Sequence, residues 1–435
     1  MTDLAPTTHD PRRVVLAYSG GLDTTACIPY LREVLGCTHV VAVAVDLGQG
    51  EDLEALRQKA RLAGANEAVV VDGRERFVTD FALPALAANA VYSGKYPLSS
   101  ALGRPVITDI VIEEARRRRC GAVAHGSTGK GNDQVRFDLG VRLAAPDLTI
   151  LAPARHWTFT RAETVRYIES LGIPAHVSAE RPWAIDVNLL GRNVEAGPIE
   201  DLDWVPTEEV WDLTADPDRS DLAPEQVSIG FRDGRPMEID GRPVAPVELI
   251  TELNRRAGAH GIGRIDVIED RIMGVKSREL YEAPGVTVLL AAHRELEQIS
   301  LPRDVLAFKA QVDALVAQYA YDGLWHAPLR EQLSAFVAAT QEGLDGTITL
   351  RLSRGRAEVL RRDVAAGLYA LDLVTYGPGC RFPVGASEGW IEIQALAGEG
   401  WRRARTAAAA VRRPAVEITP DGVGLPSVAA PRETV

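Results

Sequence analysis

The sequence predicts an α/β protein: a doubly wound parallel sheet, followed by a second α+β domain and a C-terminal segment. Short β-branched runs alternate with helical stripes over residues 14–171. Glycine-rich stretches follow two of these runs, and hairpin signals appear only after residue 220. Strands that alternate with helices form a parallel sheet covered by helices on both faces, and ligands bind at the carboxyl ends of its strands.

The first part of the chain contains the candidate strands of this sheet. Apolar runs typical of buried strands lie at residues 14–18, 38–46, 68–71, 122–124 and 148–151. Apolar residues at helical spacing predict helices at residues 23–31, 51–63, 77–90, 106–119 and 161–171. In the first turn of the first helix, side-chain oxygens of Asp23, Thr24 and Thr25 are suited to accept from unpaired N–H groups.

The second part has different signals. Two hairpins are predicted, at residues 227–239 and 348–360, with helices at 247–257, 304–319 and 328–340. Residues 286–292 are apolar and fit either a strand or a helix. We predict a disordered N-terminus (1–12), a nucleotide-binding domain (13–175), an α+β synthetase domain (176–390) and a C-terminal arm with a mobile tail (391–435).

Composition and charge limit the class of protein. The chain has 435 residues, of which 46% are hydrophobic and 25% charged, as is ordinary for globular proteins. The net charge of −12 argues against non-specific binding to nucleic acid, which requires a positive surface. No apolar run is long enough to span a membrane, and the polar first residues lack the core of a signal peptide. We therefore expect a cytoplasmic protein that binds neither nucleic acid nor a membrane.

The cysteines and the basic segments have ordinary interpretations. Cys27, Cys37, Cys120 and Cys380 show neither Cys-x-x-Cys pairing nor metal-ligand spacing, so we expect buried thiols in a reducing compartment and no metal held by protein side chains. Residues 116–119 are all arginine and follow two glutamates, which favours a solvated helix face over a nucleic-acid patch. Residues 401–413 are basic and alanine-rich, for which contact with a membrane and a helix that clasps a second subunit are the alternatives.

A candidate anion site follows the first strand, at Ser19-Gly20-Gly21-Leu22-Asp23. Glycines before a helix N-terminus let free N–H groups approach an anion. The stretch is not a Walker A loop, because no Gly-Lys-Ser/Thr follows, and it lacks the further glycines of a Gly-x-Gly-x-x-Gly motif. It resembles the pyrophosphate loop of the ATP-pyrophosphatase superfamily, whose members cut ATP between the α and β phosphates. The alternative is a tight turn without a ligand.

A second glycine-rich loop is predicted at residues 125–137 and carries many different polar groups. Thr128, Asn132, Asp133, Gln134 and Arg136 together are suited to hold a small zwitterion. The Asp133 carboxylate suits an ammonium group, and the planar fork of Arg136 suits a carboxylate. The alternative is a polar surface loop. His125 begins this loop, and its side chain could act either in catalysis or in orienting the loop.

Four stretches resemble the argininosuccinate synthase family. They are Ala-Tyr-Ser-Gly-Gly-Leu-Asp-Thr at 17–24, the whole loop at 125–137, Tyr-Ser-Gly-Lys-Tyr-Pro-Leu with Ser-Ala-Leu-Gly-Arg-Pro at 92–105, and Gly-Ile-Gly-Arg-Ile-Asp-Val-Ile-Glu-Asp-Arg with Gly-Val-Lys-Ser-Arg-Glu-Leu-Tyr-Glu at 261–282. The second loop is far more specific than the first. The resemblance spans residues 14–390 in consistent order.

The resemblance implies an enzyme that joins citrulline and aspartate with ATP and Mg²⁺. A citrullyl-adenylate forms first, and the products are argininosuccinate, AMP and pyrophosphate. It implies ATP contacts at Ala17, Tyr18, Ser19, Gly20, Gly21, Leu22, Asp23, Thr24, Thr25, Val45 and Gly126. Aspartate contacts are implied at Thr128, Asn132 and Asp133, and citrulline contacts or pocket positions at Tyr96, Ala101, Asn132, Arg136, Ala184, Asn193, Glu269 and Tyr281. The candidate catalytic residues are Asp23, which is also a candidate contact of Mg²⁺, Lys130 and Asp133. The family enzyme is usually a homotetramer clasped by its C-terminal segment.

The chain departs from the family pattern in the citrulline pocket. Ala184 stands where the family commonly has a serine that touches citrulline, and Asn193 and Ala101 stand at positions where serine also occurs. A missing hydroxyl leaves a substrate group unpaired, at a cost of roughly 1–3 kcal/mol. One alternative is therefore a paralogue that joins another ureido or amide compound to aspartate. Two other functions also stay open for the nucleotide-binding loop: a tRNA-modifying enzyme of the same superfamily and a nucleotide-binding regulator.

Overall fold

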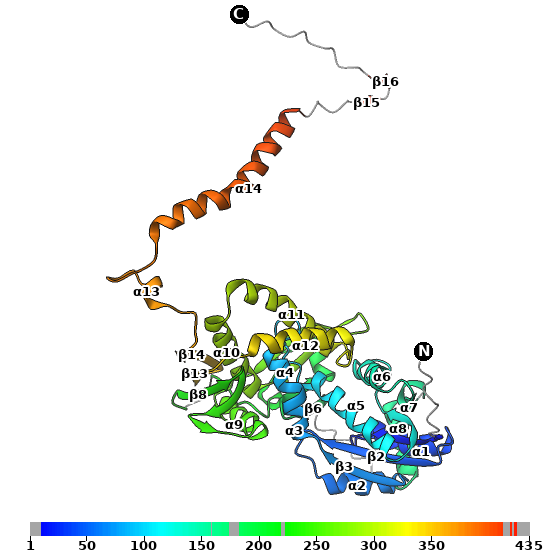
Figure 1. Ribbon diagram of the computed structural model, residues 1–435. Helices are drawn as coiled ribbons and strands as arrows, with labels where there is room; N and C mark the ends of the chain where they lie inside the picture. The colour runs from blue at the N-terminus through cyan, green and yellow to red at the C-terminus, as the bar shows by residue number, and fades with distance from the viewer. Residues whose placement is uncertain are drawn as a thin grey trace, which may run out of the picture. The chain divides into compact units, whose positions relative to one another are not determined.

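The computed structural model describes residues 10–157, 159–173, 182–218 and 222–411, together with 418–419 and 422–423. The described residues up to Leu368 belong to one compact unit, and those from Tyr369 onward belong to a second (Figure 1). Residues 1–9, most of the predicted boundary near 175, and most of the predicted mobile tail lie outside the described residues. The predicted domain boundaries at 12, 175 and 390 therefore stay predictions.

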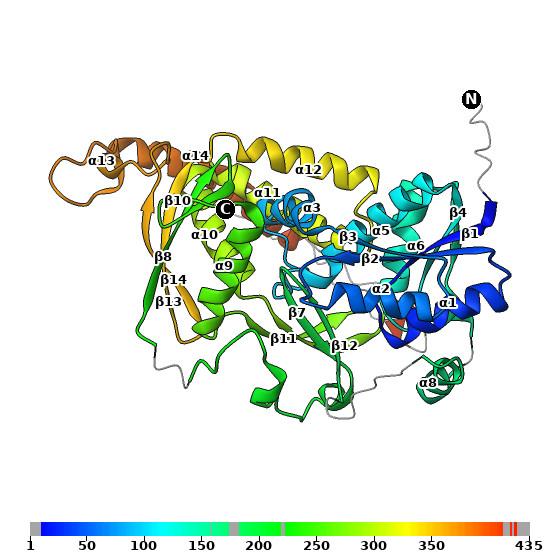
Figure 2. The ribbon, with the colours of Figure 1, turned by 90° about the horizontal axis from the view of Figure 1, so that it is seen from below.

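A five-stranded parallel sheet with the order β3-β2-β1-β4-β5 forms the first layer of the fold. Its strands are β1 (Asp10–Ala17), β2 (His39–Asp46), β3 (Glu67–Asp72), β4 (Cys120–His125) and β5 (Thr149–Leu151). Val14 and Leu16 pack against Ile28 of α1, whereas Val15 packs on the opposite face in the same core as Val106 of α5. Figure 2 shows α1 and α2 on one side of this sheet and α5 and α6 on the other. The predicted doubly wound parallel sheet is confirmed.

The helices around this sheet agree with the predicted positions, with two exceptions. Their bounds are α1 (Leu22–Glu33), α2 (Leu53–Leu62), α3 (Arg74–Arg76), the π-helical η1 (Phe77–Ala82), α4 (Leu83–Ala87), α5 (Ser99–Arg117), α6 (Asp133–Ala144), α7 (Pro153–His156) and α8 (Arg161–Ser170). At the end of α5, Arg116 pairs with Asp147, and Arg117 and the C-cap residue Arg118 both pair with Glu114. The predicted solvated face with local charge pairs is therefore confirmed.

The two exceptions concern the start of a helix. The helix predicted at 106–119 begins at Ser99, and Pro105 lies inside it, although an interior proline usually ends a helix. The Tyr96 hydroxyl accepts from the N–H groups of Ser100 and Ala101, both at 3.0 Å, and so satisfies the first turn. The predicted loop at 125–137 ends at Asn132, because α6 begins at Asp133.

Two antiparallel sheets follow. The first has the order β11-β12-β7-β6 and consists of β6 (Ala184–Asn188), β7 (Gly191–Glu195), β11 (Arg264–Asp270) and β12 (Lys276–Glu282). The second has the order β10-β9-β8-β13-β14 and consists of β8 (Glu225–Arg232), β9 (Arg235–Ile239), β10 (Arg242–Pro243), β13 (Gly346–Ser353) and β14 (Arg356–Asp363). Both predicted hairpins are present, as β8–β9 and β13–β14.

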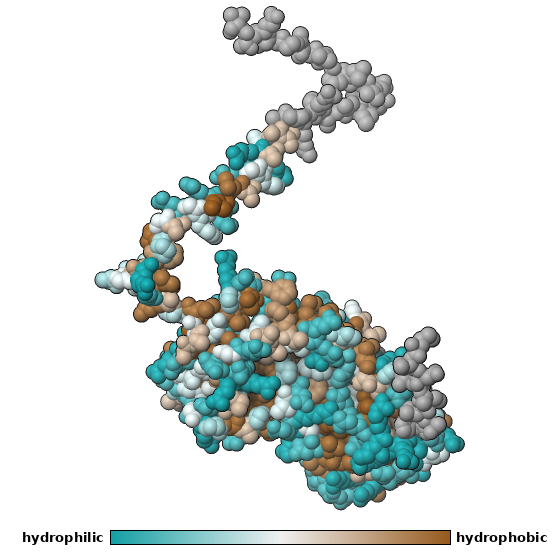
Figure 3. Space-filling model, viewed as in Figure 1, coloured by the Kyte–Doolittle hydropathy of each residue, from teal (hydrophilic) through white to brown (hydrophobic). Residues whose placement is uncertain are grey.

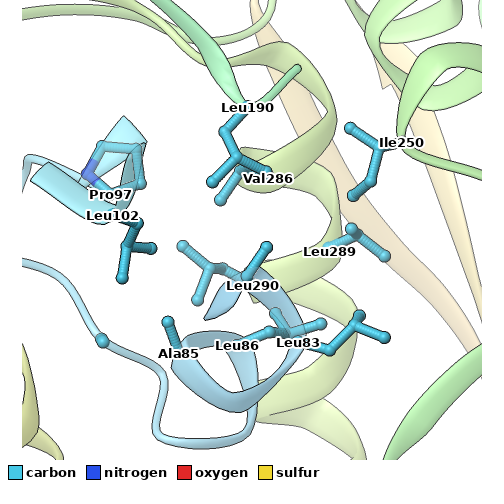
Figure 4. Close-up of a pocket in the computed structure, with 12 residues that line it drawn as sticks. Leu83, Ala85, Leu86, Pro97, Leu102, Leu190, Ile250, Val286, Leu289 and Leu290 are labelled. Carbon is cyan, nitrogen blue, oxygen red and sulfur yellow. The ribbon is translucent and has the colours of Figure 1, made fainter. Parts of the chain in front are cut away.

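Helices join these sheets to the first layer. They are η2 (Gly197–Glu200), η3 (Glu208–Val210), α9 (Pro246–Ala259), α10 (Pro284–Ser300), α11 (Arg303–Tyr321) and α12 (Pro328–Gln341), so the ambiguous segment 286–292 is helical. Figure 4 shows Leu83 and Leu86 of α4 facing Leu289 and Leu290 of α10 across a small apolar cavity. One continuous hydrophobic core extends from Val15 to Leu352 through this contact. The parallel sheet and the antiparallel sheets are therefore packed together as one body.

The second unit contains α13 (Leu371–Val374), α14 (Val384–Val411), β15 (Ile418–Thr419) and β16 (Gly422–Val423). Apolar and polar residues are interspersed along the exposed surface of α14 (Figure 3). Cys27, Cys37 and Cys120 are buried free thiols as expected, but Cys380 is exposed, so that expectation is wrong for this residue because it lies outside the packed core. None of the described helices is both long and apolar enough to cross a membrane.

Candidate active site

A cavity of about 680 Å³ lies at the carboxyl edge of the parallel sheet. Its walls come from the loop after β1, the end of β2, the turn after β4, and β6 of the antiparallel sheet. All the predicted ATP contacts except Thr25 line this cavity: Ala17, Tyr18, Ser19, Gly20, Gly21, Leu22, Asp23, Thr24, Val45 and Gly126. Thr25 is fully buried beneath the loop, where its hydroxyl lies 3.3 Å from the Tyr18 hydroxyl and 3.4 Å from the Gly20 carbonyl oxygen.

The first loop is built for close approach to an anion. Gly20 has a φ of +72°, and a Cβ there would lie 2.1 Å from a Leu56 methyl group. Gly21 is the N-cap of α1 and offers no side-chain acceptor to the first turn. The Thr24 and Thr25 hydroxyls donate to the carbonyls of Gly21 and Gly20 rather than accepting from N–H groups, so the predicted capping is wrong. N–H groups of the first turn therefore stay available to a ligand in the cavity.

The turn after β4 packs against the first loop. A Cβ on Gly126 would lie 2.7 Å from the Thr24 methyl group and 3.1 Å from the Thr24 nitrogen, so only glycine fits this contact. His125 accepts at Nδ1 from the Ser127 N–H at 3.2 Å, and its Nε2 lies 2.9 Å from Asp138. Arg155 donates to the same carboxylate at 2.9 Å. Both ring nitrogens of His125 are engaged, which supports an orienting role rather than proton transfer.

A charged cluster joins the parallel sheet to the antiparallel sheet. Arg104 of α5 donates to Asp133 of α6 and to Asp186 of β6, both at 2.8 Å, and all three residues line the cavity. Arg136 donates to the other oxygen of Asp133 at 3.1 Å, one helical turn away. Burial opposes ionisation of Asp133, but the charges and hydrogen bonds of the two arginines outweigh it and lower its pKa to about 2. Asp133 is therefore ionised at neutral pH and is a weak base.

The predicted citrulline contacts gather on one face of the antiparallel sheet. Tyr281 of β12 is paired with Asn193 of β7, and its hydroxyl donates to Glu269 of β11 at 3.1 Å. The ring of Tyr96 stacks on Tyr281 with centroids 4.0 Å apart. Within the described part of the chain, the buried Asn193 Oδ1 and Glu269 Oε2 have no hydrogen-bond partner. These two acceptors therefore point to a ligand that donates hydrogen bonds.

Burial raises the pKa of two carboxyl groups in this pocket. It raises the pKa of Glu269 to about 7, although the positive charge of Arg136 and the Tyr281 hydroxyl oppose the shift. Burial, together with the charge of Glu279, also raises the pKa of Glu195 to about 7. Glu195 lies directly across the β6–β7 pair from the exposed Ala184. The pocket therefore contains carboxyl groups that change charge near neutral pH.

Comparison with known proteins identifies the family of this chain. The arginosuccinate synthase N-terminal HUP domain matches residues 13–174, and the arginosuccinate synthase C-terminal domain matches residues 183–401. The chain belongs to the argininosuccinate synthase family. It is 49% identical to the argininosuccinate synthase of Thermosynechococcus vestitus over 89% of this chain and 97% of that protein. The argininosuccinate synthase of Prochlorococcus marinus is 48% identical over 90% of this chain and 98% of its own length.

The remaining predicted positions of this family member lie at the edges of the cavity or outside it. Thr128 and Lys130 are exposed on the second loop and do not line the cavity. Ala101 is fully buried in the first turn of α5, where its N–H donates to the Tyr96 hydroxyl. Asn132 does not line the cavity; its amide nitrogen donates to the Tyr321 hydroxyl, and its Oδ1 accepts from the Ile272 N–H.

Sequence reasoning missed three residues of the site. Arg104 lies in the stretch 92–105 that carries the family resemblance, and Asp186 lies two residues after the predicted pocket position Ala184, so their charges were a usable signal. Tyr321, at the end of α11, contacts Asn132 and Arg136, and nothing in its local sequence indicated this. Among the described residues, no group of three or more His, Cys, Asp or Glu side chains is arranged to hold a metal ion.

Proposed function

We propose that this protein joins L-citrulline and L-aspartate with ATP, giving argininosuccinate, AMP and pyrophosphate in arginine biosynthesis. The observation that carries the proposal is the single cavity that brings the Ser-Gly-Gly-Leu-Asp loop and the Asp133–Arg104–Asp186 cluster against the end of the antiparallel sheet. The family match over residues 13–174 and 183–401 supports it.

The loop after β1 holds ATP in this proposal, together with Val45 and Gly126. The fit rests on the glycines, since a Cβ at Gly20 or Gly126 would collide with Leu56 or Thr24. First-turn N–H groups of α1 bind the phosphates that leave as pyrophosphate. Asp23 lines the same cavity, and its carboxylate is suited to a Mg²⁺ ion carried by ATP. Bound Mg²⁺ would offset negative charge on the phosphates.

The other residues bind and align the two amino acids. Citrulline lies against Tyr96, Arg136, Asn193, Glu269 and Tyr281, with Ala101 and Ala184 as pocket positions, and its ureido oxygen faces the α phosphorus. Thr128, Asn132 and Asp133 hold aspartate so that its amine attacks the activated carbon and displaces AMP. A base with a pKa of about 2 accepts a proton poorly, so Asp133 acts through its charge. Lys130 remains a catalytic candidate, because its positive charge, exposed on the second loop, is suited to the negative charge of pyrophosphate.

One observation favours a second candidate substrate. Ala184 has no hydroxyl, and the buried Asn193 Oδ1 has no hydrogen-bond donor among the described residues. A related ureido or amide compound in place of citrulline satisfies the same chemistry. AMP formation should require aspartate and citrulline together. If a panel of ureido compounds supports turnover and citrulline does not, the citrulline proposal fails and the reaction class stands.

We also propose a homotetramer in the cytoplasm. The support for assembly is α14, on which Trp390 and Ile393 are 62% and 67% exposed. Covering such residues with another subunit removes apolar area from water. Light scattering should give the mass of four chains, and Trp390→Glu combined with Ile393→Glu should reduce it. The buried free thiols of Cys27, Cys37 and Cys120 support a reducing compartment.

A further inference from the structure

Tyr321 lies far along the chain from both loops and contacts two of the residues proposed to bind the amino-acid substrates. It is the last residue of α11 and is fully buried. Its hydroxyl accepts a hydrogen bond from Asn132 Nδ2 at 2.9 Å. Its main-chain carbonyl accepts from Arg136 Nε at 2.8 Å. One residue therefore contacts both the end of the second loop and the first helical turn after it.

The contact with Asn132 defines the orientation of that side chain. The N–H of Ile272 donates to Asn132 Oδ1 at 2.9 Å, so the oxygen of the amide faces the β11–β12 turn. The amide nitrogen must then face the Tyr321 hydroxyl. Each group keeps further capacity, since an amide nitrogen has two hydrogens and an amide oxygen two lone pairs. Asn132 is therefore held in one orientation with one donor and one acceptor site left for substrates.

The contact with Arg136 is of a different kind. The guanidinium carbon lies 4.8 Å from the centroid of the Tyr321 ring, within the range of cation–π attraction. A Cβ on Gly323 would lie 2.6 Å from the Arg136 Cα, so the turn after α11 packs directly on the backbone of α6. The Tyr321 ring is itself fixed, because it stacks on Tyr92 with centroids 3.6 Å apart. Arg136 is thus positioned by a ring and a carbonyl that cannot move independently.

We propose that Tyr321 is a positioning residue for the ligation, which orients Asn132 through its hydroxyl and Arg136 through its ring and carbonyl. The inference rests on the proposed function, in which Asn132 contacts both amino acids and Arg136 contacts citrulline. Tyr321 does not line the ATP-loop cavity. Its effect is therefore confined to the amino-acid substrates and leaves the binding of ATP unchanged.

Tyr321→Phe tests the hydroxyl alone, because it keeps the ring and the main-chain carbonyl. The variant leaves the Asn132 nitrogen without its partner, and the kcat/KM values for citrulline and aspartate should each fall roughly 5- to 100-fold. The KM for ATP should stay within about twofold, since the ATP loop is untouched. Tyr319→Phe is the matched control: the same atom is removed from a half-buried tyrosine on the same helix, and wild-type kinetics are expected.

A double-mutant cycle separates positioning from general damage. In an Asn132→Ala background the effect of Tyr321→Phe should disappear, because the hydroxyl then has no amide to orient. Calorimetric titration with citrulline extends the cycle to variants whose turnover is too slow to measure. Equal losses in both backgrounds, no loss in Tyr321→Phe, or a parallel rise in the KM for ATP would each overturn the inference. A wild-type protein that forms no AMP from ATP, citrulline and aspartate would instead overturn the proposed function.

Discussion

Glu269 gives the citrulline pocket a pH dependence that can be worked out from its surroundings. Its side chain is buried, one oxygen accepts from Tyr281, and the other has no partner among the described residues. Burial raises the pKa of this carboxyl group to about 7. Below this pH the group is a neutral acid, and above it the group is a carboxylate. We propose that Glu269 faces the α-ammonium group of citrulline. This group keeps its charge throughout, so it binds the carboxylate more tightly than the neutral acid.

The size of the effect follows from the fraction of ionised carboxyl group. This fraction is about one tenth at one pH unit below the pKa and about nine tenths at one unit above it. If only the ionised form binds, the KM for citrulline at about pH 6 should be roughly ten times the value at about pH 8. Steady-state AMP formation at saturating ATP and aspartate measures this ratio directly.

Two variants decide which carboxyl group is responsible. Glu269→Gln should raise the KM for citrulline and remove its dependence on pH between about 6 and 8. Glu195→Gln is the control, because the pKa of Glu195 is also raised to about 7. The account requires the pH dependence to persist in this second variant. A KM that is constant with pH in the wild type, or a dependence lost only in Glu195→Gln, would show that Glu269 does not control citrulline binding.

Three further changes have defined outcomes. Asp23→Ala should lower AMP formation about 100-fold or more while the unfolding midpoint stays unchanged, because the side chain lines the cavity; near-normal turnover contradicts the loop assignment. Gly126→Ala should raise the KM for ATP, since its Cβ would meet the Thr24 backbone at 3.1 Å, whereas Gly131→Ala, with no atom within 4 Å, should not. Equal effects at both glycines would show that the contact is unimportant. Glu282→Gln should lower the free energy of unfolding by about 3–5 kcal/mol in urea titration, because the fully buried carboxylate pairs with a buried arginine and accepts from main-chain amides. A loss below about 1 kcal/mol would contradict that burial argument.

The parallel sheet was predictable because its evidence is local. Its strands are short apolar runs, and a glycine follows the carboxyl end of β1, β2, β3 and β4 within three residues. The start of α6 was missed because Gly131, Asn132 and Asp133 have the composition of a loop, although Asp133 is also a favourable first-turn residue. Pro105 similarly concealed the first turn of α5, whose N–H groups are satisfied by a tyrosine outside the helix.

The contacts between distant segments could not be predicted. Tyr321 meets Asn132 across 189 positions of the sequence, and its own helix has an ordinary pattern. Arg104 lies on α5, which covers the parallel sheet, and Asp186 lies on β6 of the antiparallel sheet, so the two side chains meet only when the two layers pack. Charge and residue type named candidates for the site. Which of these candidates contact one another depends on tertiary packing, and the spacing of residues in the sequence does not predict it.

In the proposed reaction, this cavity places the ureido oxygen of citrulline against the α phosphorus of ATP. Citrulline labelled with heavy oxygen in its ureido group tests the claim in a single turnover with aspartate and ATP. The account predicts that the label appears in the phosphate of AMP, because that oxygen forms the new bond to phosphorus and leaves with it. Label found in pyrophosphate, or AMP formed without label, would contradict the account.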